Sequence, residues 1–220
     1  MKVLFSALLA FVLCVSAASA ELLTTANPIG QGKWAVLGGY LSDANVNNVS
    51  GYTMGTIAGY AGYGVTDKLD VYLTGGSATV SGLPATISVS MTALGLTGKY
   101  QVLAESASMP VSVGVGVGYK SINTTASLAA GGNATGSQMM AGVGVSKMMA
   151  PFIPYGGLAY RSTASGGSTV GTQLDLTVGS AVAWSTQGAV FVEYTLQSVT
   201  PNGGTAYSSG QIGLGVGYII

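Results

Sequence analysis

Residues 55–75 read GTIAGYAGYGVTDKLDVYLTG, and this stretch decides which fold the sequence predicts. Apolar residues alternate with small or polar residues on both sides of a polar Thr-Asp-Lys tripeptide at 66–68. Successive side chains of a β-strand point to opposite faces, so the alternation indicates two strands and the tripeptide indicates a tight turn. In the second strand Leu69, Val71 and Leu73 share one face. We interpret the stretch as a β-hairpin.

The same alternation recurs along the rest of the chain. Each alternating segment is about 9–13 residues long, which is the length that a tilted strand needs to cross a bilayer. The ten segments are 33–41, 53–65, 69–79, 91–102, 110–121, 137–148, 152–162, 173–184, 189–199 and 209–220. Long connections at 42–52, 80–90, 122–136, 163–172 and 200–208 alternate with short ones, and Asp43 is the only charged residue in the long connections.

Composition indicates what surrounds these strands. The chain of 220 residues is 48% hydrophobic and only 6% charged, with 35 glycines, whereas about a quarter of the residues in a soluble domain are charged. Beyond the N-terminus there is no run of about 18 apolar residues that predicts a membrane helix.

The two faces of the strands differ in polarity. In 110–121, valines face one way and glycines the other. An apolar outer face with a small or polar inner face suits a barrel surrounded by lipid. The prediction is a ten-stranded antiparallel transmembrane β-barrel; eight strands, or a secreted soluble β-sandwich, are the alternatives.

Aromatic residues on the outward face give an independent indication. A membrane barrel carries two girdles of aromatic side chains, one at each interface. By strand direction, one level is predicted to hold Trp34, Tyr63, Tyr100, Phe152, Trp184 and Tyr218, and the other Tyr40, Tyr119 and Tyr160.

The N-terminus indicates export. Lys2, the apolar run 3–15 and the small residues 18–20 occur in the order of a secretory signal peptide, so cleavage is expected before Glu21. The predicted organisation is a signal peptide at 1–20, a periplasmic lead-in at 21–32 and the barrel at 33–220. The one cysteine, Cys14, lies in the signal peptide, so we expect no disulfide. The charge is close to neutral, which gives no reason to expect nucleic acid as a partner.

Four features of the chain occur together: the signal peptide, the turn at 66–68, the periodic glycine and aromatic residues, and the final GVGYII. In these features the chain resembles the small bacterial outer-membrane β-barrel proteins, of the channel-less or narrow-channel type. The resemblance implies residence in the outer membrane of a Gram-negative bacterium, with lipid and lipopolysaccharide around the barrel. It also implies insertion by the barrel-assembly machinery, and a monomer is favoured. An even number of strands places both termini on one side, which in bacterial barrels is the periplasm.

Six charged residues are expected inside the barrel. If the hairpins are symmetric, Asp70 lies opposite Lys99, and Arg161 lies opposite Asp175 across the connection 163–172. Cross-strand pairs of opposite charge are stabilising, so the interpretation is either a structural ion-pair plug or the lining of a selective channel. The six residues are Asp70, Lys99, Lys120, Arg161, Asp175 and Glu193.

Two of these six are not assigned an ionic partner. Glu193 is expected between Gly179 and Gly215, which leave it room to extend into the lumen. Lys120 is expected opposite Ser137 or Gln138. Both are interpreted as solvated lumen charges.

The inventory of side chains argues against catalysis. Outer-membrane hydrolases of this size class use histidine as a general base, and the chain contains no histidine. The carboxylates Asp70, Asp175 and Glu193 fall on different strands, so they predict neither an acid–base pair nor a metal site, and no cofactor is predicted. The function predicted is therefore non-enzymatic, either structural or a very narrow passive channel. An adhesion or binding barrel that acts through its outer loops is the alternative.

Overall fold

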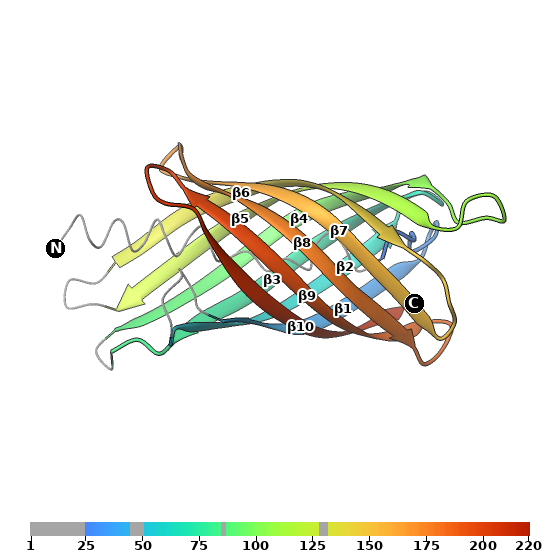
Figure 1. Cartoon of the computed structure of the whole chain (residues 1–220), viewed down its shortest axis with the longest axis horizontal. Coiled ribbons are helices and arrows are strands. Elements are labelled where there is room, and N and C mark those ends of the chain that lie inside the picture. Colours follow the sequence, from blue (N-terminus) through green and yellow to red (C-terminus); the bar gives the residue numbers. More distant parts are fainter. Residues whose placement is uncertain (1–24, 45–50, 85–86, 128–131) are drawn as a thin grey trace.

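In a computed structural model, which describes residues 25–44, 51–84, 87–127 and 132–220, the strands wrap into a closed barrel (Figure 1). Every strand pairs antiparallel with its neighbours in the sequence, and the first strand pairs with the last. The strands are β1 (Trp34–Ala44), β2 (Thr53–Gly64), β3 (Leu69–Ser81), β4 (Ser88–Leu103), β5 (Ser112–Ser127), β6 (Gly132–Ser146), β7 (Phe152–Ser165), β8 (Ser168–Ala183), β9 (Gly188–Pro201) and β10 (Tyr207–Ile219).

This topology confirms the predicted ten-stranded barrel. The two alternative predictions, an eight-stranded barrel and a soluble β-sandwich, are wrong. Closure follows from the pairing of β1 with β10, which runs from Ala35 opposite Ile219 to Ala44 opposite Gly210. A closed barrel leaves no strand edge unpaired, as a span through lipid requires. No helix in the described part of the chain is long and apolar enough to cross a membrane. The predicted signal peptide lies outside the described residues.

Two of the connections predicted to be long are much shorter than expected. The expected loop 122–136 is mostly strand, because β5 continues to Ser127 and β6 begins at Gly132. The expected loop 163–172 is a turn of two residues, Gly166 and Gly167, with φ of 59° and 82°. Positive φ at both positions gives the type of tight turn that matches strand twist. The prediction was wrong because serine and threonine were interpreted as loop residues, although β-branched threonine fits a strand well.

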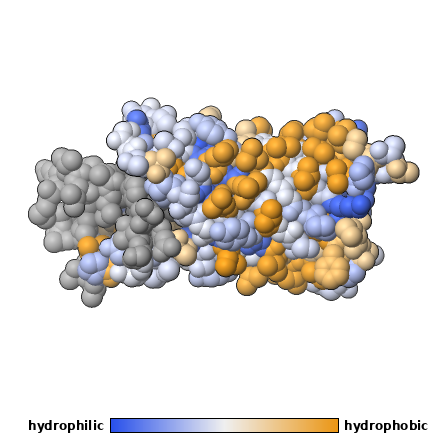
Figure 2. All heavy atoms as spheres, in the orientation of Figure 1, coloured by the Kyte–Doolittle hydropathy of each residue, from blue (hydrophilic) through white to orange (hydrophobic). Residues whose placement is uncertain are grey.

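The outer wall of the barrel is apolar, as the alternation predicted. On β10 and β8, every second side chain faces outward, including Leu214 and Leu176, which are 54% and 52% exposed. Figure 2 shows such side chains spread along the visible wall as broad orange areas. Outward aromatic residues of the predicted level that includes Trp34 are exposed near the strand ends, and the rings of Trp34 and Tyr63 lie 4.9 Å apart. The residues predicted for the other level are exposed towards the middle of their strands; they are Tyr40, Tyr119 and Tyr160.

The two ends of the barrel differ, and we name them by their connections. The turn end carries the connections 65–68, 104–111, 147–151 and 184–187, and the loop end carries the other five. The backbone of Trp34 is hydrogen-bonded to Ile220 in both directions, so the beginning of β1 and the C-terminus share the turn end (Figure 1).

The described part of the expected lead-in, residues 25–32, packs inside the turn end. Ala26 and Ile29 are buried. The amide of Ala26 donates to Ser146 Oγ at 3.0 Å, and Ile29 packs against Ala35 and Tyr72. We call residues 25–32 the N-terminal segment.

Candidate functional site: the barrel lumen

At the turn end, an ion pair holds the N-terminal segment in place. Asp70 lies opposite Lys99 in the register of β3 and β4, as hairpin symmetry predicted, and Lys99 Nζ is 3.2 Å from Asp70 Oδ2. Lys99 Nζ also donates to the carbonyl oxygens of Thr25 and Asn27, at 3.2 and 2.8 Å. The Ile29 amide donates to both carboxylate oxygens of Asp70 at 3.1 Å. The pair therefore connects the barrel wall to a segment that is distant in sequence.

Nearer the loop end, Arg161 and Asp175 form the second ion pair. Arg161 Nε donates to Asp175 Oδ2 at 2.6 Å, and both side chains are fully buried. The predicted pair thus forms, but the predicted register is wrong, because Arg161 lies opposite Gln173 and Asp175 lies opposite Ala159. The short turn and an irregularity after Thr163 shift the pairing. A long side chain reaches its diagonal neighbour on the same face, so the contact survives the shift.

Amide and hydroxyl side chains extend this ion pair into a network. Gln173 Nε2 donates to Asp175 Oδ1 at 2.6 Å, and Arg161 Nη1 donates to Gln138 Oε1 at 3.3 Å. Gln138 Nε2 in turn donates to Thr163 Oγ1 at 3.0 Å. These five side chains come from β6, β7 and β8, and we call them the polar belt. Because buried charges are stable only when they are paired and hydrogen-bonded, the belt explains why Arg161 tolerates complete burial.

Asp43 is a lumen residue that the sequence analysis placed in a loop. The structure corrects this, because β1 continues to Ala44 and the side chain of Asp43 is fully buried. Asp43 lies opposite Gln211, whose Nε2 donates to Asp43 Oδ2 at 2.9 Å. The signal was present in the sequence: Asp43 continues the alternation that places Leu37 and Leu41 inside the barrel.

Glu193 lies about halfway along the lumen and accepts a hydrogen bond from Tyr155 Oη at 3.0 Å. Its neighbour on β8 is Gly179, as predicted, whereas its neighbour on β10 is Gly213 rather than Gly215. The β9–β10 register is shifted by two residues from the predicted one. A Cβ on Gly213 would lie 2.7 Å from Glu193 Cγ, so glycine at this position leaves space for the glutamate.

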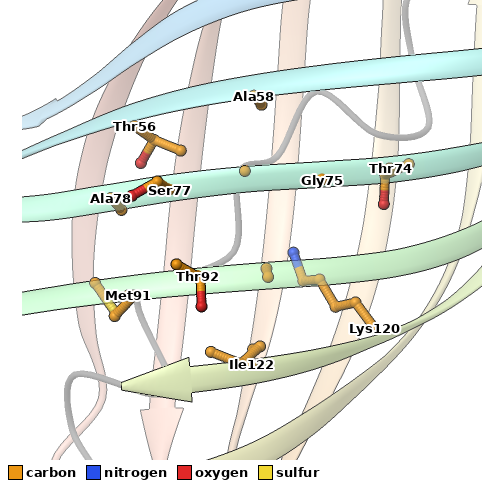
Figure 3. Close-up of a pocket in the computed structure, with 12 residues that line it drawn as sticks. Thr56, Ala58, Thr74, Gly75, Ser77, Ala78, Met91, Thr92, Lys120 and Ile122 are labelled. Atoms are coloured by element: carbon orange, nitrogen blue, oxygen red, sulfur yellow. The ribbon is translucent and has the colours of Figure 1, made fainter. Parts of the chain in front are cut away.

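Lys120 is buried, and its neighbour on β6 is Gln138, one of the two predicted. Its other neighbour, on β4, is Gly95, where a Cβ would lie 2.7 Å from Lys120 Cβ. Figure 3 shows the side chain of Lys120 beside a small cavity that Thr74, Met91 and Ile122 help to line. The cavity holds about 20 Å³, which is room for a single water molecule.

Apart from Gln138, which was expected beside Lys120, the glutamines and hydroxyls that form hydrogen bonds in the lumen were missed by the sequence analysis, which assigned roles only to the charged residues. Gln197 Oε1 accepts from Ser209 Oγ at 3.0 Å, and the hydroxyls of Thr177 and Thr195 are 2.8 Å apart. The alternation that identified the inward charges also places these side chains inside. In the described ranges, no three acidic, histidine or cysteine side chains are grouped so that they could hold a metal ion.

An apolar outer wall around a hydrogen-bonded lumen, closed by ten antiparallel strands, is the architecture of the outer-membrane β-barrel proteins. No protein-family model matches the chain, and no curated protein matches it. Solved structures do match. The translocator domain of the autotransporter NalP from Neisseria meningitidis is similar with a TM-score of 0.50 and 12% identity, over 86% of this chain and 89% of that chain.

Two other matching structures are Neisserial surface protein A and the outer-membrane protease OmpT from Escherichia coli. The first has a TM-score of 0.46 and 14% identity, over 86% of this chain and 97% of that chain. The second has a TM-score of 0.45 and 12% identity, over 93% of this chain and 99% of that chain. At this level of identity the similarity concerns the fold alone.

Proposed function

We propose that the protein is a non-enzymatic barrel whose role in the outer membrane is structural, with at most a very narrow passive pathway through its lumen. The observation that carries the proposal is the polar belt, in which Arg161 and Asp175 are fully buried and bonded to side chains from three strands. Ten strands enclose a narrow lumen, whereas aqueous porins have 16–18 strands. The belt therefore stabilises the barrel and narrows the lumen.

The carboxylates support a non-enzymatic role, because each has structural partners of its own. Asp70 binds Lys99 and the N-terminal segment, Asp175 binds Arg161 and Gln173, and Glu193 accepts from Tyr155. Histidine is the side chain that most often serves as a general base, and the chain contains none.

The surroundings that fit this proposal are lipid and lipopolysaccharide, with insertion by the barrel-assembly machinery. The exposed apolar wall supports contact with lipid. A monomer is favoured. At the loop end, β7 and β8 are joined by only Gly166 and Gly167, so this connection offers little surface for adhesion.

Single-channel recording in planar lipid bilayers tests the proposal. The wild-type protein is expected to give no conductance steps of porin size. A triple substitution of the polar belt, Gln138→Ala with Arg161→Ala and Asp175→Ala, is expected to give small, steady steps because it removes long side chains that project into the lumen. Leu158→Ala, which alters an outward side chain of β7, is the matched control and should behave as wild type. Steps of porin size from the wild-type protein would contradict a structural role.

A further inference from the structure

The lumen at the turn end is filled on one side and hollow on the other. The N-terminal segment occupies the side formed by β3 and β4, where it is bonded to Asp70 and Lys99. A cavity of about 830 Å³ occupies the rest, between this segment and the connection 184–187. That volume is in the range of about 300–1,000 Å³ that is typical of sites for small organic molecules.

The wall of this cavity is apolar, although the lumen of a membrane barrel is ordinarily polar. On five adjacent strands, the inward residues are apolar at the turn end and become polar or charged farther along the barrel axis. On β9, for example, Ala189 and Phe191 at the turn end are followed by Glu193, Thr195 and Gln197. The apolar inward residues at the turn end that line the cavity include Ala35, Leu37, Ile153, Ala181, Phe191 and Ile219.

Within the described residues that line the cavity, Lys99 is the only one that carries a charge. Its Nζ already contacts the Asp70 carboxylate and two carbonyl oxygens, and the hydroxyl of Tyr72 donates to Asp70 at 3.1 Å. The wall thus offers no counter-charge to a ligand. Uncharged polar side chains occur at the rim, on Ser185, Thr186 and Gln187, and on the N-terminal segment, at Thr25 and Asn27.

We propose that this cavity binds an elongated apolar molecule without net charge that ends in a hydroxyl or a similar polar group, such as a single-chain lipid alcohol. The apolar body packs against Leu37, Ile153 and Phe191, and the polar end lies at the rim formed by residues 185–187. Binding removes apolar wall from water, which is the driving force for such a site. The inference goes beyond the structural role and does not depend on conduction.

Photolabelling tests the proposal, with the protein in lipid nanodiscs and a long-chain alcohol that carries a diazirine on its chain as the probe. Labelled peptides are mapped by mass spectrometry. We expect labels on the inward residues Leu37, Ile153 and Phe191, in addition to a background on the outward face. A probe of the same length that ends in a carboxylate is expected to label these inward residues less.

Two substitutions on neighbouring residues of β9 provide the matched comparison. Ala189→Phe fills the cavity and is expected to lower inward labelling by about tenfold, which corresponds to about 1.4 kcal/mol of binding free energy. Val190→Phe alters the outward face and should leave inward labelling unchanged. If Ala189→Phe fails to fold, judged by heat-modifiable migration on a gel, Ala183→Leu, at a partly buried position that also lines the cavity, with Val182→Leu as control replaces it. Labelling confined to outward residues, or unaffected by the filling substitution, would overturn the proposal, as would equal labelling of the inward residues by the carboxylate probe.

Discussion

Arg161 shows, at the scale of the residue, why the lumen charges occur in pairs. Its guanidinium is fully buried and bonded to Asp175 and Gln138. Burial of an isolated charge is costly, and removal of one partner leaves the other without compensation. The pair was predictable from residue type and alternation, whereas Gln138 and Gln173 were not predicted to complete its hydrogen bonding.

Replacing Arg161 by alanine is therefore expected to lower the free energy of unfolding by about 3–5 kcal/mol, because Asp175 stays buried without its cation. Replacing both residues by leucine is expected to restore much of the loss, since it removes the stranded charge. Denaturant titration in phospholipid vesicles, followed by tryptophan fluorescence, measures both effects. Lys147→Ala, at an exposed position in a turn, is the control and should change the value by less than about 0.5 kcal/mol. An Arg161→Ala protein as stable as this control would contradict a stabilising role for the pair.

At the scale of the element, the seam between β1 and β10 closes the barrel, and glycines allow the two strands to approach. Gly39 faces inward opposite Gly215, and a Cβ at Gly39 would lie 2.9 Å from the backbone oxygen of Leu214. At Gly38, which faces outward, the nearest atom would be the Ala58 oxygen at 4.0 Å. Adjacent glycines of one strand thus differ in how much space they have.

This difference predicts opposite effects of the same substitution. Gly39→Ala is expected to destabilise the barrel by about 1–3 kcal/mol, because backbone of β10 must move to admit the methyl group. Gly38→Ala is expected to be neutral or to stabilise by up to about 1 kcal/mol, since alanine loses less backbone entropy on folding. The same unfolding titration compares them. Equal effects of the two substitutions would show that the seam does not restrict side-chain size.

At the scale of the whole molecule, the apolar wall distinguishes a barrel in lipid from a barrel in water. Leu176 is in the middle of β8, opposite Leu158 and Leu196, and its side chain faces outward. Val182 faces outward on the same strand near the turn end. The two positions therefore sample different depths of the wall.

In a bilayer, Leu176→Arg is expected to cost about 2–4 kcal/mol and Val182→Arg only about 0–1 kcal/mol, because the penalty for a charge falls from the midplane to the interface. On the surface of a soluble barrel both would cost less than about 0.5 kcal/mol. Unfolding titrations in vesicles measure the two values. Identical small effects at both positions would argue against a membrane-spanning wall.

The sequence by itself determined the strands, their outward faces and the pairing of Asp70 with Lys99. Alternation with a period of two is a local property of the extended backbone, and the symmetry assumed for the hairpin of β3 and β4 placed Asp70 opposite Lys99. Only the tertiary structure decided the registers that place Gln173 opposite Arg161 and Gly213 opposite Glu193. These registers depend on where each turn lies, which contacts in the folded barrel select among alternatives, and on barrel closure; β7 and β8, for example, are joined by only Gly166 and Gly167. The entry of residues 25–32 into the lumen and the cavity beside them have the same origin, because they result from contacts between residues distant in the chain.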